Sequence, residues 1–311
     1  MSRARRRQII LVGLVILILA GTLFHTKYYL SRPIGSGPAG PAVDSESFAS
    51  PWTDRKVHIV AFGDSITAGL GANSPAHSYV NRLIANPPDE YADMQGKCLS
   101  AVLPNLTHAN HAVSGTTSLH HIDAIAERLA PHSEETFGIV LLTTGGNDLI
   151  HNYGRTAPHE GAMFGATAAE AEPWIENFET RLEEMLALFA SAFPGGHEVY
   201  LANIYDPTDG VGDGASIFLP PWDDGLEIHA QYNAIIAKAA DRHDDVHLVD
   251  LHKHFLGHGS HSQQFWREHY DNADPHYWYY NNIEDPNDRG YDAIRRIFLN
   301  TITSNTTLIA R

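Results

Sequence analysis

The sequence predicts an α/β domain on a five-stranded parallel sheet, because two hydrophobic patterns alternate along most of the chain. From residue 56 onward, short apolar runs typical of buried strands alternate with stretches of helical periodicity. The expected strands are Val57–Phe62, His108–Val113, Gly138–Thr143, His197–Ile204 and Val246–Leu251. The expected helices are Ser78–Ala85, Ser118–Leu129, Ala168–Phe193, Leu226–Asp241 and Asp288–Ile302. Such alternation favours parallel pairing.

Composition excludes several classes of protein. With 311 residues, 43% of them hydrophobic, the chain can bury an ordinary globular core. The 37 acidic and 21 basic residues give a net charge of −16, which argues against a nucleic-acid partner or an anionic membrane surface for the globular part. Cys98 is the only cysteine, so an internal disulfide and a cysteine-based zinc site are excluded.

The first 30 residues have the pattern of a membrane anchor or a secretory signal. Four arginines between positions 3 and 7 precede the uncharged apolar run Ile9–Phe24, and Tyr28 and Tyr29 follow it. Ala20-Gly21-Thr22 is a poor cleavage site, which favours an uncleaved anchor. Because basic flanks stay in the cytoplasm, we expect an extracytoplasmic domain, anchored to the membrane or secreted if the segment is cleaved.

Residues 31–55 are rich in Gly, Pro, Ala and Ser and have no apolar periodicity. This composition predicts a flexible linker between the N-terminal segment and the domain of residues 56–311.

Unusual residues follow the first three expected strands. Ser65 stands where the first strand turns into a helix, and Gly115 and Asn147 follow the second and third strands. The carboxyl ends of parallel strands meet at one edge of the sheet, where ligands bind. A serine at the start of a helix offers a hydroxyl and an unpaired N–H, which together can supply a nucleophile and part of an oxyanion hole.

Three motifs around these residues resemble, in order and spacing, the first three blocks of the SGNH (GDSL-type) hydrolase family. They are Gly63-Asp64-Ser65, Asn110-His111-Ala112-Val113-Ser114-Gly115-Thr116 and Thr144-Gly145-Gly146-Asn147-Asp148, and the resemblance extends from Lys56 to the C-terminus. It implies a three-layer α/β/α sandwich with a flavodoxin-like sheet. It also implies that Ser65 attacks an ester carbonyl, and that the N–H groups of Ser65 and Gly115 and the Asn147 amide hold the oxyanion. Family substrates are lipid, acetylated-sugar or small acyl esters, and no metal or organic cofactor is implied.

The general base is the part that departs from the family pattern. The family has Asp-x-x-His-Pro-Asn before the last helix, whereas this chain has Asn282 and Asp285 at the aspartate and histidine positions. Three explanations are open. A histidine of the loop after the fifth strand can serve as base, with His261 and His276 favoured over His258; Asp285 itself can serve; or the protein binds a ligand without catalysis.

Two other polar clusters could bind metal ions but have simpler structural explanations. His252, His254, His258 and His261 could suggest zinc, but the intervening glycines favour a histidine-rich rim. Asp206, Asp209 and Asp213 could suggest calcium, but their spacing does not match an EF-hand and favours a turn-rich lid.

Three further expectations concern side chains around the site. Asp64 and Asp148 are expected to hold their loops through backbone hydrogen bonds. His229 is expected to face solvent on its helix. The aromatic-rich segment between Phe265 and Tyr280 is expected to pack in the core or to form a platform above the cleft.

Overall fold

All five strands form one parallel sheet in the computed structural model, which describes residues 2–309. The strand order is β2-β1-β3-β4-β5, the order of a flavodoxin-like sheet. The strands are β1 (Lys56–Phe62), β2 (Leu106–Asn110), β3 (Thr136–Thr143), β4 (His197–Ala202) and β5 (Val246–Val249). The predicted fold class is confirmed, and the strands lie within a few residues of their expected positions.

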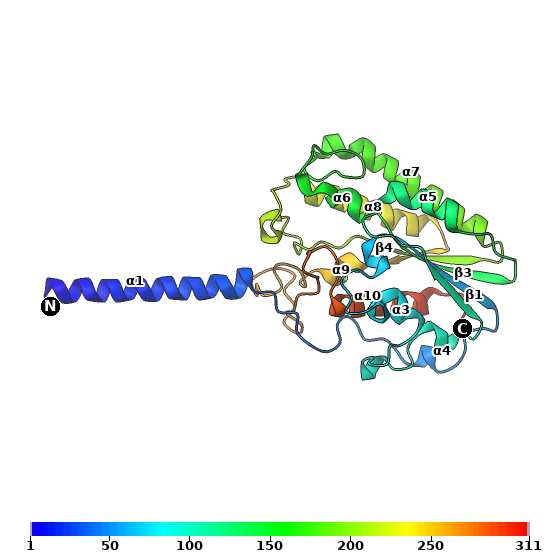
Figure 1. Ribbon diagram of the computed structural model, residues 1–311, viewed down its shortest axis with the longest axis horizontal. Helices are drawn as coiled ribbons and strands as arrows, with labels where there is room; N and C mark the ends of the chain where they lie inside the picture. The colour runs from blue at the N-terminus through cyan, green and yellow to red at the C-terminus, as the bar shows by residue number, and fades with distance from the viewer. Residues whose placement is uncertain (1, 310–311) are drawn as a thin grey trace.

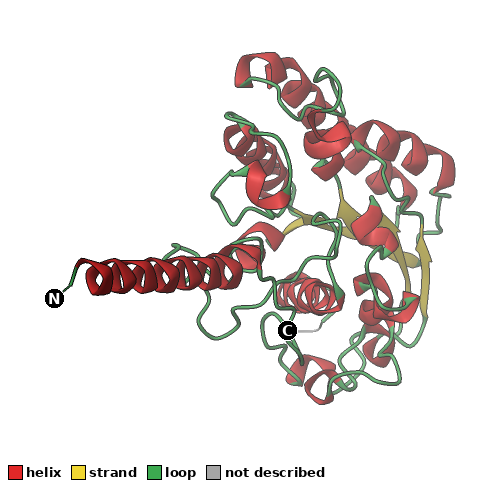
Figure 2. Cartoon of the chain, turned by 60° about the vertical axis from the view of Figure 1, so that its left-hand side comes forward, coloured by secondary structure: helices red, strands yellow, loops and turns green. Residues whose placement is uncertain are grey.

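Helices cover both faces of the sheet (Figures 1 and 2). One layer contains α3 (Tyr79–Ile84), α4 (Leu99–Val102), α9 (Leu251–Phe255) and α10 (Asp288–Asn305). The other contains α5 (Ser118–Arg128), α7 (Ala168–Ala192) and α8 (Gly225–Arg242). Two short helices, α2 (Ser65–Ala68) and α6 (Gly146–Ile150), follow β1 and β3 directly.

Alternation along the central strands fills both cores. Ile59 and Ala61 of β1 belong to the core under α10, whereas Val60 and Phe62 belong to the core under α7. A strand buried on both faces reads as a continuous apolar run, as β1 and β3 do in the sequence.

The N-terminal helix α1 (Arg3–His25) projects away from the domain (Figure 1). It continues into a π-helical turn, Thr26–Leu30, and every residue of α1 is exposed. The combined segment of 28 residues has a mean hydropathy of 2.5 in its most apolar window. It is therefore long and apolar enough to cross a membrane, and a signal sequence has the same features.

The segment 31–55 lies packed on the domain, so the expected flexible linker does not fit the structure. Ala39, Val43 and Trp52 are buried in the same core as α10. The Arg289 side chain donates to three carbonyls of this segment, those of Ile34, Gly37 and Pro38.

The backbone of this segment passes close to α10, which explains its many small residues, a composition that is also typical of a linker. A Cβ at Gly40 would lie 2.7 Å from the Cα of Ala293 in α10, so only glycine fits there. The glycines and prolines of the segment thus serve tight packing and carbonyl binding rather than freedom of movement. The chain between α1 and the sheet is therefore held against the domain.

Candidate active site

Ser65 is the first residue of α2 and lies at the carboxyl end of β1. Asp64 caps this helix, since its side chain accepts a hydrogen bond from the Ile66 N–H at 3.2 Å. A Cβ at Gly63 would lie 2.1 Å from Thr143 Oγ1, so glycine is needed for β1 to turn this closely past β3. The Ser65 N–H, at the first position of the helix, has no intrahelical acceptor.

Gly115 and Asn147 are brought together by a direct hydrogen bond between their loops. Asn147 Nδ2 donates to the carbonyl oxygen of Thr116 at 2.8 Å. Gly115 has a φ of +80°, and its N–H finds no acceptor within residues 2–309. The structure therefore places an unpaired backbone donor one residue from the carbonyl that holds the Asn147 amide.

Asp148 holds the Asn147 loop, as expected. Its Oδ2 accepts the Ser118 N–H at 2.8 Å, which ties α6 to the start of α5. Arg181 of α7 lies 3.7 Å from the other oxygen of this buried carboxylate. The backbone role expected for Asp64 and Asp148 is thus confirmed.

The carboxylate of Asp285 lies close enough to Ser65 for the serine hydroxyl to influence its pKa, but no hydrogen bond of ordinary length joins the two side chains. Burial raises the pKa of Asp285, while the Ser65 hydroxyl and a hydrogen bond from Asn282 oppose the increase. Asn282 Nδ2 donates to Oδ2 at 2.5 Å. Oδ1 is buried and has no hydrogen-bond partner within the described part of the chain, so it is the oxygen free to accept a proton. Contacts between a nucleophile and its base are often long before substrate binds.

Two of the three candidate histidines point to carboxylates away from Ser65. His261 Nε2 lies 2.9 Å from Asp213 Oδ1. His276 Nδ1 bonds Asp274, which is also bound by Arg289. The structure therefore does not bring His261 or His276 to Ser65.

His258 is likewise occupied elsewhere. Its ring stacks on Trp278 with centroids 3.5 Å apart, and its Nδ1 lies 3.2 Å from the carbonyl oxygen of His276. Among the described residues that line the pocket of Ser65, none of these three histidines occurs. The physical reason is that the imidazoles of the loop between α9 and α10 pack and form hydrogen bonds within this loop and with Asp213.

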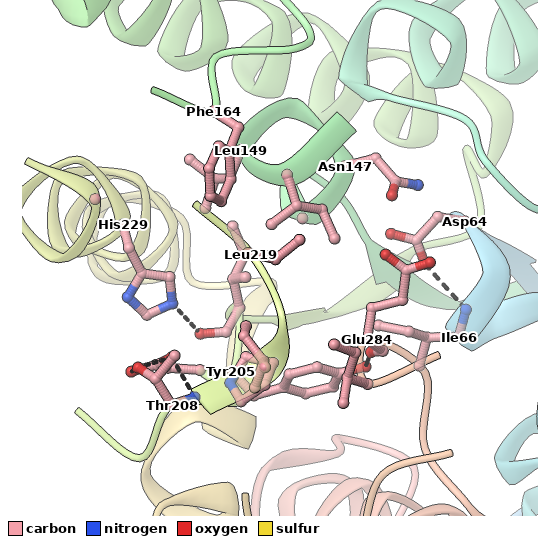
Figure 3. Close-up of a pocket in the computed structure, with 18 of the residues that line it drawn as sticks. Asp64, Ile66, Asn147, Leu149, Phe164, Tyr205, Thr208, Leu219, His229 and Glu284 are labelled. Carbon is pink, nitrogen blue, oxygen red and sulfur yellow. Dashed lines mark hydrogen bonds between the residues drawn. The ribbon is translucent and has the colours of Figure 1, made fainter. Parts of the chain in front are cut away.

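Ser65 and Asn147 line a largely apolar pocket, shown in Figure 3. The labelled Asp64, Asn147 and Glu284 lie at one end of it, and His229 and Thr208 at the other. Its apolar lining consists mainly of Leu149, Phe164, Ile217, Leu219, Trp222 and Leu226. The pocket thus leads from a polar end at Ser65 into an apolar arm, which is lined in part by residues of the segment 212–226 and reaches His229 and Thr208.

Sequence reasoning misplaced one pocket residue, His229. His229 is buried rather than solvent-facing, because its Nε2 bonds the carbonyl oxygen of Ile204 at the end of β4, 2.8 Å away. Glu284 lines the pocket and accepts a hydrogen bond from the Tyr153 hydroxyl. Helical periodicity could not find His229, since the strand-end carbonyl that it meets is distant in sequence.

Asp209 and Asp206 hold loops through hydrogen bonds. The Asp209 carboxylate accepts three backbone N–H groups, those of Gly257, Gly259 and His261, at 2.8–2.9 Å. Asp206 accepts from Thr208 and from the Gly210 N–H. Asp209 thus joins the loop after β4 to the loop after α9, whereas Asp206 orders the first of these loops. Within residues 2–309 no cluster of three His, Cys, Asp or Glu side chains is arranged to hold a metal ion.

Asp64 is a buried carboxyl with a pKa raised to about 7, mainly by burial, with a contribution from nearby Asp285. Because the folded-state pKa lies above the ordinary value of 3.8, Asp64 stabilises the fold most below pH 4. That contribution is lost as the pH rises through 7.

We expect Asp64→Asn to raise the stability at pH 8 by up to about 4 kcal/mol and to change it little at pH 4. Asparagine stays neutral and can still cap α2. Thermal unfolding of the full chain in detergent micelles at the two pH values measures the difference. An equal effect at pH 4 and pH 8 would contradict the assignment.

The chain belongs to the GDSL-like lipase/acylhydrolase family, whose model matches residues 61–293. The extracellular lipase from Streptomyces rimosus has a similar fold, with a TM-score of 0.51 and 16% identity, over 80% of this chain and 100% of that one. A catalytic mutant of Axe2, an acetylxylan esterase from Geobacillus stearothermophilus, gives a TM-score of 0.50 and 16% identity, over 82% and 96%. No curated protein matches the chain in sequence. Family membership supports an esterase or acylhydrolase.

Proposed function

We propose that the protein is a membrane-anchored, extracytoplasmic serine esterase in which Asp285 takes the place of the usual histidine. The observation that carries this proposal is the position of Asp285 beside the pocket of Ser65: its partner Asn282 lines that pocket, and its buried Oδ1 has no hydrogen-bond partner among the described residues. The hydrogen bond between Asn147 and Thr116 supports it, because it holds the Asn147 amide to the residue that follows Gly115, another expected oxyanion donor.

In the first half of the reaction, Ser65 Oγ forms a bond to the carbonyl carbon of the ester and its proton passes to Asp285. The carbonyl oxygen becomes an oxyanion, held by the N–H groups of Ser65 and Gly115 and by the Asn147 amide. The carbon–oxygen bond to the alcohol then breaks, and the proton on Asp285 passes to the departing alcohol.

In the second half, a water molecule attacks the acyl-Ser65 ester and gives its proton to Asp285. The same three donors hold the second oxyanion. Collapse of this intermediate returns the proton to Ser65 Oγ and releases the carboxylic acid.

A carboxylate with an ordinary pKa is a weak base at neutral pH, so its environment matters. Burial raises the pKa of Asp285 and brings it closer to the working pH. Asn282 fixes one carboxylate oxygen, in the way that a carboxylate fixes the ring in a serine–histidine pair. The two departures from the family pattern therefore act together: an amide holds a carboxylate where an aspartate would hold an imidazole.

The apolar arm of the pocket suits the hydrocarbon chain of the acyl group of the ester. Leu149, Phe164 and Trp222 line the arm that leads from Ser65. Burial of a hydrocarbon chain there stabilises the complex by about 0.8 kcal/mol per methylene group. We therefore propose an ester of a fatty acid as substrate rather than an acetylated sugar.

The anchor and its direction rest on α1. Its length and hydropathy suit a membrane span, and Arg3, Arg5, Arg6 and Arg7 stand at its N-terminal end. Because basic residues remain on the cytoplasmic side, the domain would be outside.

We expect Asn147→Ala to lower kcat for a p-nitrophenyl ester by about 10²–10³-fold, because one oxyanion donor is lost. KM should change much less, since the amide acts on the charge of the transition state. Asn110→Ala is the matched control: its amide bonds the Thr67 carbonyl near the same loops at 2.8 Å and lies outside the proposed oxyanion set. Equal losses of kcat in both variants would mean that Asn147 only holds a loop.

A further inference from the structure

An aromatic cluster joins the end of the N-terminal helix to the domain. The ring of Trp266 stacks on Phe24 with centroids 5.5 Å apart and lies 5.4 Å from Tyr28. Phe265 meets Tyr28 edge-on at 5.7 Å. Figure 1 shows α1 leaving the domain beside these loops between α9 and α10. Phe265 and Trp266 are nevertheless 59% and 40% exposed.

The length of α1 sets the level of this cluster in a membrane. At 1.5 Å per residue, the 23 residues of α1 extend about 35 Å, slightly more than the roughly 30 Å hydrocarbon core of a bilayer. With the arginines at one surface, Phe24 and Tyr28 lie at the other, where aromatic side chains are favoured. Phe265 and Trp266 contact these rings and therefore lie at the same level.

Phe218 is a third exposed aromatic residue of the domain, and it has an unusual backbone. Its side chain is 82% exposed, and its φ of +63° is a conformation that bulky side chains rarely adopt. Packing does not explain a phenylalanine at this position. A strained, exposed aromatic residue is better explained by a function outside the folded domain.

Arg32 connects Phe218 to the base of the helix. Its guanidinium donates to the carbonyl oxygen of Ser216 and lies 5.6 Å from the centre of the Phe218 ring. Arg32 comes two residues after the π-helical turn that ends at Leu30, and the segment that follows is packed on the domain. Phe218 is thus linked through Arg32 to the chain segment that directly follows the N-terminal helix.

The residues on both sides of Phe218 belong to the pocket. Ile217 and Leu219 line the apolar arm that leads to Ser65. The same turn therefore presents one aromatic ring outward and two aliphatic side chains to the cavity. Any surface that covers Phe218 therefore lies next to two residues of the pocket lining.

We propose that Phe218, Phe265 and Trp266 form an aromatic rim that inserts into the outer interface of the bilayer crossed by α1. The rim holds the apolar arm of the pocket open toward the membrane, so an ester enters acyl chain first from the bilayer. The bilayer is the surface that covers the rim, because Phe265 and Trp266 contact the N-terminal helical segment and the chain that follows this segment is packed on the domain. This inference rests on the proposed anchor and deepens the proposed esterase function.

Spin labelling of the full chain in phosphatidylcholine vesicles tests the rim. The buried Cys98 is first replaced by alanine, and a nitroxide is attached to Phe218→Cys, to Leu17→Cys in the middle of α1, or to Glu135→Cys before β3. The Glu135 side chain is 74% exposed at the opposite end of the strands. We expect the labels at 17 and 218 to be relaxed mainly by oxygen, and the label at 135 mainly by a water-soluble nickel chelate.

The possible outcomes separate the anchor from the rim. If the label at 17 is embedded and the label at 218 is as accessible to nickel as that at 135, the rim is wrong and the anchor stands. The same outcome is expected if the rim binds another protein instead of the bilayer, because these vesicles contain no other protein. If the label at 17 is accessible to nickel, both the anchor and the rim are wrong.

Phe218→Asn tests the route of the substrate, because asparagine tolerates a positive φ and keeps the turn. We expect the ratio of hydrolysis of a long-chain ester in vesicles to that of a soluble short-chain ester to fall about tenfold. An unchanged ratio would overturn entry from the bilayer. Absence of activity on both esters in the unsubstituted protein would overturn the esterase proposal, whereas the spin-label result would still decide the rim.

Discussion

Ser65→Ala is expected to lower the hydrolysis of a p-nitrophenyl ester by about 10⁴-fold or more, because the covalent route is lost. The hydroxyl lies at the start of α2, beside a buried carboxylate and next to a pocket. A fluorophosphonate probe, which reacts with activated serines, should label the unsubstituted protein and leave the variant unlabelled. Kinetics and mass spectrometry of the labelled peptide measure the two effects.

Ser114→Ala is the matched control for this experiment. Ser114 is exposed and stands beside Gly115 on the neighbouring loop. The control should keep both its activity and its labelling. Labelling of Ser65→Ala would show that another residue is the nucleophile, and no labelling of the folded unsubstituted protein would favour a binding protein without catalysis.

Asp285→Asn is expected to lower kcat by about 10²–10⁴-fold, the usual contribution of a general base. Asparagine has nearly the same size, so the buried site and its contact with Asn282 are largely kept. In the unsubstituted protein, the rate should rise with pH as Asp285 loses its proton. This rise should occur above the pH range of an ordinary aspartate, because burial raises the pKa.

His276→Ala and His261→Ala serve as controls for the choice of base. Both imidazoles bond carboxylates away from Ser65, so each variant should keep kcat within a few-fold. A loss of several orders of magnitude in either variant, together with an active Asp285→Asn, would mean that a histidine moves in to act as base.

Most of the fold could be predicted because local patterns and tertiary structure agree in this chain. The strands β1 and β3 are continuous apolar runs, and both faces of the sheet are covered. Residues 31–55 were misinterpreted for a physical reason. Their order comes from Arg289 and Ala293, which are some 250 positions away, and no local periodicity records such contacts.

The site could be predicted only where its residues follow strand ends. Ser65, Gly115 and Asn147 are placed by the sheet itself, so their order in the sequence predicts their proximity. The position of a base on a long loop depends instead on which partners the loop side chains find. Asp274, Asp213 and Trp278 hold the histidines of that loop, whereas Asp285 Oδ1 has no hydrogen-bond partner among the described residues.

A crystal structure of the protein phosphonylated on Ser65 tests the central claim most directly. We predict that the phosphonyl oxygen lies 2.7–3.1 Å from the N–H groups of Ser65 and Gly115 and from Asn147 Nδ2. The Asp285 carboxylate should be beside Ser65 Oγ. A phosphonyl oxygen that faces away from Asn147, or an imidazole in the place of the Asp285 carboxylate, would contradict the account.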